Sequence, residues 1–241
     1  MLKLNKFKAI IKKCLGYTVS SKRCSISHSG TEFEVQMWAV SEFIASKIIP
    51  VTGCHPFPLT ELSLMVAAVI YLKPDYIFEW GTNIGKSARI FYETCSFFGI
   101  NSQIHSIDLP DDHKHCEHPG SERGIFVRKI SEVKLHQGDG AETAIRIGND
   151  IDFKNGSCLY FLDGDHSYAS VKRELDLIYS HNLNANFLVH DTFFQSEQAG
   201  YNIGPHLAVR DFLDKTPNVF FRIDAKLGLP GMTLLYQKRT K

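Results

Sequence analysis

Short apolar runs alternate with longer amphipathic segments through most of this chain, a pattern typical of strands alternating with helices. Strands are predicted at residues 76–78, 103–108, 133–139, 159–162 and 186–189. Helices are predicted at residues 60–72, 88–98, 141–147 and 206–213. Alternation of this kind favours an α/β domain with a mostly parallel sheet and helices on both of its faces.

Two features complete this outline. Ahead of the first strand, residues 34–49 have helical spacing and are expected to cover the mouth of the site, and Thr60 is expected to cap the helix that follows. At the other end, Val219–Ile223 and Met232–Tyr236 predict two closing strands, which makes seven in all.

The first fifty residues differ from the rest, so we place a domain boundary between an extension, 1–50, and a main domain, 51–241. Residues 1–13 hold five lysines, and Leu4, Phe7 and Ile11 fall on one face of a basic amphipathic helix. Such a helix can lie on an anionic membrane surface or pack as an ordinary terminal helix.

Composition and charge narrow the class of protein. At 241 residues and 44% hydrophobic, one main domain with a sizeable core is expected. The net charge of +1 gives no support to a nucleic-acid partner. Six cysteines without Cys-x-x-Cys spacing favour free thiols in a reducing, cytoplasmic compartment. No long apolar run or signal-peptide pattern predicts a span or export, although the basic segment allows peripheral contact at the inner face of a membrane.

A glycine-rich turn follows the first predicted strand. Residues 76–87 read Tyr-Ile-Phe-Glu-Trp-Gly-Thr-Asn-Ile-Gly-Lys-Ser. Gly81 and Gly85 allow a sharp turn and close approach to a ligand, and the helix that begins near Ser87 directs free backbone N–H groups at that ligand. The spacing lacks the Gly-x-Gly-x-x-Gly of dinucleotide sites. With Glu79 before the first glycine, it suits a nucleoside with an amino-acid tail, although an ordinary strand–helix turn would look similar.

Acidic residues end the next two strands as well. Asp108 can accept hydrogen bonds from two ribose hydroxyls, or it can cap the next helix. Asp139, after Gly138, can hold an adenine amino group, or it too can be a helix cap. Ligands of open α/β sheets bind at the carboxyl ends of strands, where Glu79, Asp108 and Asp139 would all lie.

The last two strands of the alternating region carry the candidate chemistry. Asp163 ends one strand within Asp-Gly-Asp-His-Ser-Tyr, and His190-Asp191 ends the next. Neighbouring strands lie ~4.8 Å apart, so Asp163 and Asp191 could share one hard cation. His166 can act as a general base or can simply bond a neighbouring acid at a helix start, and Asp165 is expected to cap that helix.

This ordered series resembles the class I S-adenosylmethionine-dependent methyltransferases over residues 74–213. Within them, the last two motifs resemble a branch that includes cephalosporin-hydroxylase-like, rhamnosyl O-methyltransferase-like and macrolide sugar O-methyltransferases. The resemblance implies a Rossmann-like methyltransferase fold whose seven-stranded, mostly parallel sheet ends in an antiparallel hairpin. It also implies that the following residues contact S-adenosylmethionine: Glu79, Gly81, Thr82, Asn83, Gly85, Ser87, Asp108, Gly138, Asp139 and Asp163.

The same resemblance implies a catalytic pair and a metal site. His166 falls where the macrolide sugar enzymes have their general base, with Asp163 as the second catalytic residue, and Asp163, Asp191 and His190 are the implied ligands of Mg²⁺. One position departs from the pattern, because His190 stands where those relatives have a second acid. An imidazole suits softer ions than Mg²⁺. Either the metal differs, or His190 is not a ligand, or no metal binds.

Two loops are candidates for substrate contact. The loop 111–118 contains His113, His115, Cys116 and His118, whose spacing matches no structural zinc pattern and favours a lid or substrate loop. The loop 193–206 is aromatic and is expected at the mouth of the site, and Arg210 beyond it can pair with an anionic substrate or form a surface salt bridge.

The function expected from these features is metal-assisted methyl transfer from S-adenosylmethionine to a hydroxyl of a sugar, glycan, glycolipid or small molecule. A hydroxylase-like or N-methylating family member is the alternative enzyme. A non-catalytic subunit that binds the cofactor is the alternative outside catalysis. The sequence does not determine the acceptor, the methylated position or the oligomeric state, and it is compatible with an oligomer.

Overall fold

The computed structural model describes residues 33–113, 119–151, 156–195, 200 and 202–237. The basic segment 1–13 lies outside the described residues, so its membrane contact stays a prediction, as does the domain boundary at residue 50. No helix among the described residues combines the length and the apolar character that crossing a bilayer requires.

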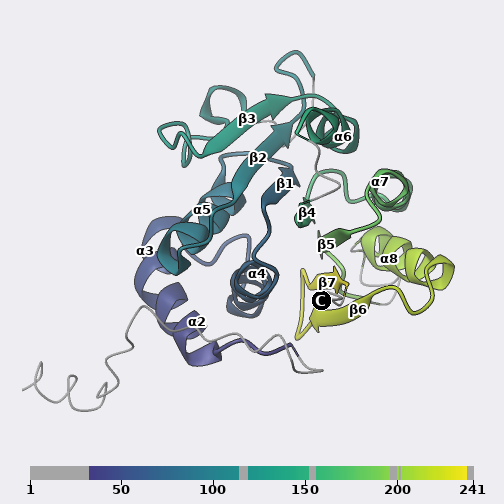
Figure 1. Cartoon of the computed structure of the whole chain (residues 1–241), viewed down its shortest axis with the longest axis horizontal. Coiled ribbons are helices and arrows are strands. Elements are labelled where there is room, and N and C mark those ends of the chain that lie inside the picture. Colours follow the sequence, from purple (N-terminus) through teal and green to yellow (C-terminus); the bar gives the residue numbers. More distant parts are fainter. Residues whose placement is uncertain (1–32, 114–118, 152–155, 196–199, 201, 238–241) are drawn as a thin grey trace, which may run out of the picture.

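Within the described residues, seven strands form one sheet in the order β3-β2-β1-β4-β5-β7-β6 (Figure 1). The strands are β1 (Tyr76–Trp80), β2 (Gln103–Asp108), β3 (Val133–Gln137), β4 (Cys158–Leu162), β5 (Ala185–His190), β6 (Phe221–Ala225) and β7 (Met232–Tyr236). The first five pair in parallel, and β7 pairs antiparallel with both β5 and β6. The predicted sheet and its terminal antiparallel hairpin are confirmed. Strand order reverses between β1 and β4, where ligands of such sheets bind.

Helices cover both faces of the sheet, as Figure 1 shows. One face packs against α2 (Met37–Phe43), α4 (Leu59–Leu72) and α5 (Lys86–Phe98), and the other against α6 (Gly140–Asp150), α7 (Tyr168–His181) and α8 (Gly204–Lys215). The remaining helical segments are a π-helix η1 (Ile44–Ile48), α3 (Ile49–Thr52) and a 3-10 turn η2 (Gly120–Glu122). Two apolar cores result, one on each side of the sheet.

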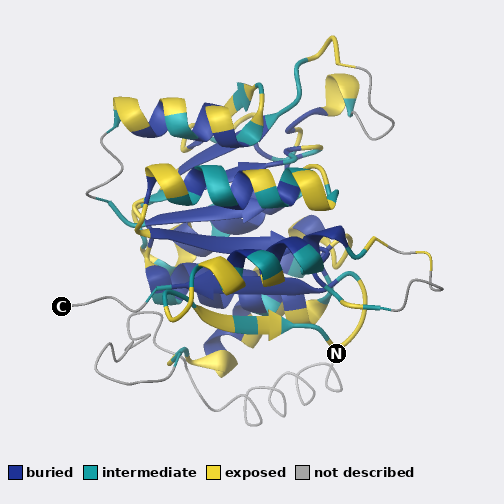
Figure 2. Ribbon diagram, turned by 90° about the vertical axis from the view of Figure 1, so that its right-hand side faces the viewer, coloured by how far each residue is buried: buried dark blue, intermediate teal, exposed yellow. Residues whose placement is uncertain are grey.

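The central strands are apolar throughout because both of their faces are covered. Every residue of β4 and of β5 is buried, and Figure 2 shows the central strands as a buried layer between helices whose outer sides are exposed. The helices are one-sided, as in α5, where Ala88, Phe91 and Cys95 face the core. Cys95 and Cys158 are buried, and neither belongs to a disulfide, in agreement with the reduced thiols expected from the sequence.

Two predictions about the helices before β1 were wrong. The helix α4 begins at Leu59 after Pro58, and neither Thr60 nor another side chain caps it. Of residues 34–49, the first three precede the helix, and the others fall into α2, η1 and the start of α3, which pack against α4 and α5. Their apolar side chains, such as Val40 and Phe43, fill the core on that face and do not line the site.

Candidate active site

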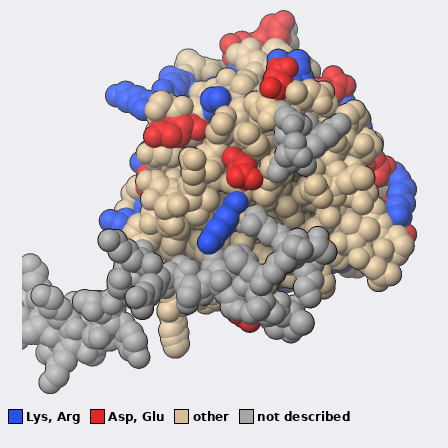
Figure 3. Space-filling view, viewed as in Figure 1, with Lys and Arg blue, Asp and Glu red and all other residues tan. Residues whose placement is uncertain are grey.

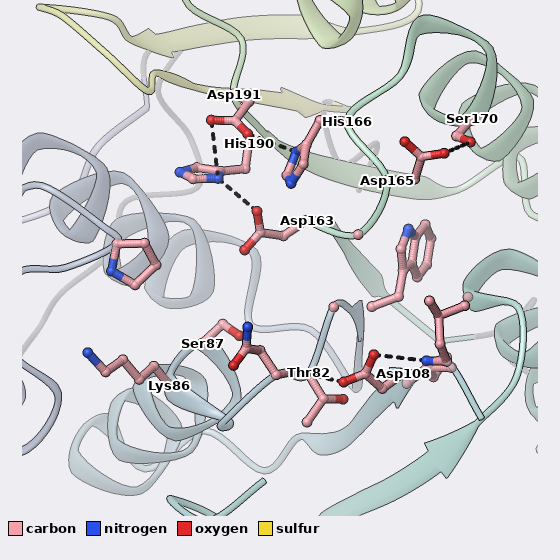
Figure 4. Close-up of a pocket in the computed structure, with 18 of the residues that line it drawn as sticks. Thr82, Lys86, Ser87, Asp108, Asp163, Asp165, His166, Ser170, His190 and Asp191 are labelled. Carbon is pink, nitrogen blue, oxygen red and sulfur yellow. Dashed lines mark hydrogen bonds and ion pairs between the residues drawn. The ribbon is translucent and has the colours of Figure 1, made fainter. Parts of the chain in front are cut away.

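A cavity of about 980 Å³ opens at the carboxyl ends of the parallel strands. Its wall combines the turn after β1, the ends of β2, β4 and β5, and the residues that follow β3. In the projection of Figure 4, the group His166, His190 and Asp191 and the group Thr82 and Ser87 lie on opposite sides of Asp163. Most of the site residues predicted from the sequence therefore line one cavity. The volume of this cavity is near the upper end of the ~300–1,000 Å³ range of small-molecule sites.

The turn after β1 brings the backbone of two motifs into contact. Gly81 has φ +90°, and a Cβ placed there would lie 2.1 Å from the backbone oxygen of Asp163, so only glycine fits. Asn83 also has positive φ and turns its side-chain oxygen to the amide of Ile84, at 2.7 Å. The helix α5 then starts with no side-chain cap after Gly85, so its first amides are open to an anionic group in the cavity.

Glu79 lies behind this turn, outside the cavity wall. It is fully buried and accepts a 2.5 Å hydrogen bond from Ser106, whose hydroxyl also lies 2.6 Å from that of Thr82. Burial raises the pKa of Glu79 to about 7, with the hydrogen bond from Ser106 acting in the opposite direction. In this structure Glu79 braces the turn, and its predicted contact with the cofactor stays untested.

Asp108 ends β2 on the cavity wall. Its carboxylate accepts hydrogen bonds from the backbone amides of Asn83, at 2.9 Å, and Leu109, at 2.8 Å, and Arg123 lies 3.5 Å away. These contacts fix the carboxylate beside the glycine-rich turn. A carboxylate has about four acceptor positions, so capacity for a ribose hydroxyl remains.

Asp139 and Gly138 lie on the wall next to Asp108. Asp139 caps α6 by accepting from the Glu142 amide at 2.9 Å, and it pairs with Arg173 at 2.9 Å. The helix-cap alternative is therefore correct for its geometry, and adenine binding stays a prediction. Gly140, which the sequence did not single out, lies so close to Trp80 that a Cβ would be 2.3 Å from the indole.

His166 and Asp191 form a hydrogen-bonded pair at the other end of the cavity. Asp191 follows β5 in a left-handed conformation, φ 56°, and its Oδ2 lies 2.8 Å from His166 Nδ1. Burial lowers the pKa of His166, but the hydrogen bond and charge of Asp191, with the charge of Asp163, raise it above its ordinary value overall. With Nδ1 held by a carboxylate, the imidazole has a fixed orientation, as a general base requires. The prediction that Asp165 caps α7 was wrong, because the capping residue is Ser167 and Asp165 instead accepts hydrogen bonds from Ser167 and Ser170 just before the helix.

His190 lies between carboxylates from different elements. Its Nδ1 is 2.7 Å from Asp163 Oδ1, and its Nε2 is 3.0 Å from Glu61 Oε2 on α4. Burial lowers the pKa of His190, but the charge of Asp163 and the hydrogen bonds to Asp163 and Glu61 raise it well above its ordinary value. Glu61 was not predicted from the sequence, although a lone acid within the apolar helix Leu59–Leu72 is a usable indication of a buried polar contact.

The donor set at the strand ends does not fit the predicted Mg²⁺. Asp163 and Asp191 are the oxygen donors that Mg²⁺ takes, but both nitrogens of His190 face carboxylate oxygens. Among the described residues, no three His, Cys, Asp or Glu side chains converge as a metal site. The predicted ligand role of His190 therefore disagrees with its contacts here.

The rest of the cavity wall differs from the loops predicted for it. His113 and Pro119 line it, while residues 114–118 lie outside the described part of the chain. The described residues of the loop 193–206 do not line it, and Phe194 instead packs on His206. Arg210 pairs with its neighbour Asp211 away from the cavity, so the salt-bridge alternative is correct. Two further segments, which were not predicted from the sequence, complete the cavity wall: Cys54–Pro58 and Leu229–Pro230.

This fold and strand-end site define a class I S-adenosylmethionine-dependent methyltransferase. Residues 54–234, about three quarters of the chain, match the family rhamnosyl O-methyltransferase/CmcI, and the chain belongs to that family. No curated protein matches the chain in sequence.

Solved structures share the fold at low sequence identity. The calicheamicin methyltransferase CalS11 is 14% identical, with 83% of this chain and 90% of that chain covered and a TM-score of 0.51. The SAH-bound methyltransferase PaMTH1 of Podospora anserina is 14% identical, with 98% and 96% covered and a TM-score of 0.51. The O-methyltransferase of Bacillus cereus in complex with SAH is 13% identical, with 95% and 96% covered and a TM-score of 0.51. At these identities the similarity establishes the fold.

Proposed function

We propose that this chain transfers a methyl group from S-adenosylmethionine to a hydroxyl group of a sugar or a sugar-containing small molecule. The observation that carries the proposal is that one cavity holds both the glycine-rich turn and the His166–Asp191 pair. Membership of a family named for rhamnosyl O-methyltransferases supports a sugar acceptor.

The residues of the turn fit S-adenosylmethionine. The uncapped start of α5 and Lys86, both at the cavity, suit the carboxylate of the cofactor, and Asp108, on the cavity wall at the end of β2, suits the hydroxyls of its ribose. When bound, this cofactor supplies a methyl group made electrophilic by the adjacent sulfonium. The protein must then align the acceptor and remove its proton.

His166 is the group placed to take that proton. Asp191 binds its Nδ1, which leaves Nε2 as the nitrogen for an acceptor hydroxyl. A positioned base of this kind contributes roughly 10²–10⁴ in rate. Phe57, Pro58 and Leu229 line the same cavity and offer apolar surface for the carbon face of a sugar ring. Net charge and the interspersed charges on the face shown in Figure 3 give no support to a nucleic-acid acceptor.

An acceptor screen with isotopically labelled methyl donor tests the proposal. Free sugars, nucleotide-linked sugars, glycolipids and matched amines are incubated with the protein and with His166→Asn. We expect label only on hydroxyl acceptors and a loss of roughly 10²–10⁴ in rate in the variant, with cofactor affinity unchanged. Cofactor binding without transfer to any acceptor would indicate a non-catalytic subunit. Transfer only to amines, or turnover by His166→Asn at the original rate, would contradict the assignment.

A further inference from the structure

Three carboxylates surround the ring of His190. Glu61 comes from α4, Asp163 from the end of β4, and Asp191 from the residue after β5. The ring nitrogens lie 3.0 Å from Glu61 Oε2, 2.7 Å from Asp163 Oδ1 and 3.8 Å from Asp191 Oδ1. The His190 side chain is 6% exposed and that of Glu61 is 2% exposed, so solvent screens the charges of these two side chains only weakly.

With Glu61 and Asp163 both present as carboxylates, their hydrogen bonds set the charge of this ring. An ionised carboxylate accepts hydrogen bonds and donates none, so each ring nitrogen that faces one must carry a hydrogen. The other oxygen of Glu61 is also used as an acceptor, from the Gly231 amide at 2.7 Å. A ring with hydrogens on both nitrogens is a cation. His190 therefore places one positive charge between the carboxylates at the ends of β4 and β5.

A positive charge is needed at this point of the fold. Asp163 and Asp191 end neighbouring strands, and carboxylates held this close repel one another or share a proton unless a cation lies between them. In a metal site the bound ion supplies that charge. Here the ring of His190 lies against Asp163, and Asp191 Oδ2 is turned to His166 at 2.8 Å.

We propose that His190, held by Glu61 and Asp163, occupies the position of a divalent cation, so that this chain keeps its two strand-end carboxylates in place without a metal ion. Glu61 and His190 are then positioning residues, which keep Asp163 and Asp191 apart and aim Asp191 at His166. The inference deepens the proposed function, because it concerns the same site.

The main test is a titration that does not depend on turnover. Full-length protein saturated with S-adenosylhomocysteine is titrated with Mn²⁺ by electron paramagnetic resonance and with Zn²⁺ by calorimetry. Asp191→Asn is the matched control, because asparagine tolerates the left-handed conformation at this position. We expect the protein and the control to bind the same amount of each metal. One further equivalent of Mn²⁺ or Zn²⁺ in the wild type would overturn the proposal, because His190 would then be a metal ligand supported by Glu61.

A second test converts the site. In the double variant H190E/E61Q, an acid replaces the imidazole beside Asp163 and Asp191, and its neighbour on α4 loses its charge. Carboxylates are the ligands that Mn²⁺ and Mg²⁺ prefer. We expect Mn²⁺ to bind at least about tenfold more tightly than to the wild type, the smaller end of the effects that changes around a metal have on affinity. A double variant that still binds S-adenosylhomocysteine but gains no Mn²⁺ affinity would contradict the proposal.

The proposal of methyl transfer and the proposal about His190 can fail independently of each other. If no acceptor is methylated, the metal titrations still decide the role of His190. If methyl transfer is found, excess chelator should leave its rate unchanged. A rate that falls in chelator and returns with Mg²⁺ or Mn²⁺ would overturn the inference about His190 and leave methyl transfer established.

Discussion

The contact between Gly81 and the backbone of Asp163 gives a prediction whose size follows from the structure. In Gly81→Ala the new Cβ would lie 2.1 Å from the Asp163 carbonyl oxygen, more than 1 Å short of ordinary contact, which begins at 3.4 Å. Both sides of this contact are backbone, so no side chain can rotate away. The turn after β1 and the turn after β4 must separate.

Gly99→Ala is the matched control. Gly99 also has positive φ, +67°, but a Cβ there meets nothing within 4 Å. Both variants carry the left-handed penalty of roughly 1–2 kcal/mol. Only Gly81→Ala adds the cost of overpacking, about 1–3 kcal/mol. For a chain of this length, that difference lowers Tm by roughly 2–12 °C more than the control does.

Thermal unfolding and calorimetry with S-adenosylhomocysteine measure the two consequences. Gly81→Ala should unfold earlier than Gly99→Ala and should bind the ligand at least about tenfold more weakly, the equivalent of about 1.4 kcal/mol. Gly99→Ala should keep the affinity of the wild type. If both variants unfold at the same temperature and bind equally well, the two turns do not form one cofactor site.

Three further predictions concern single acids. Glu79, with its pKa raised by burial to about 7 from 4.5, keeps its proton longer in the folded chain, so its contribution makes the free energy of unfolding fall between about pH 4.5 and 7, by on the order of 3 kcal/mol. In urea unfolding, the free energy of unfolding of Glu79→Gln relative to the wild type should therefore be higher at pH 8 than at pH 5. A difference between the two proteins that does not change with pH would argue against a buried acid. Asp108→Asn should weaken cofactor binding by about 1–3 kcal/mol in calorimetry, and equal affinity would remove the ribose assignment. Asp191→Asn removes the hydrogen bond to a carboxylate and the charge that contribute most to the raised pKa of His166, and it leaves the burial that lowers this pKa, so the acidic limb of kcat/KM should move to lower pH. An unmoved limb would mean that another group titrates.

Much of the fold could be predicted because its central strands are buried on both faces. The strands Gln103–Asp108 and Met232–Tyr236 have the predicted bounds, since short runs of this length bounded by turn residues favour a strand over a helix. The helix starts were harder. Thr60 has the side chain of a capping residue, but Pro58 sets the start of α4.

The candidate site was predictable where its residues follow strands. Parallel strands bring their carboxyl ends to one edge, which is why Asp108, Asp163 and Asp191 meet at the cavity as expected. Contacts across distant segments were not predictable. Glu61 reaches His190 over 129 positions in the sequence, and no local pattern encodes that distance. Residues Cys54–Pro58 were not predicted either, because they line the site but belong to no helix or strand whose pattern could be recognised.

The most direct test of the central claim is where the methyl group goes. Protein, S-adenosylmethionine labelled with ¹³C in the methyl group and a sugar acceptor from the screen are incubated together, and the product is examined by NMR and mass spectrometry. The proposed function predicts a product heavier by one methylene, whose labelled carbon is bonded to a sugar oxygen. A labelled carbon bonded to nitrogen, or a product heavier by one oxygen atom and free of label, would contradict it.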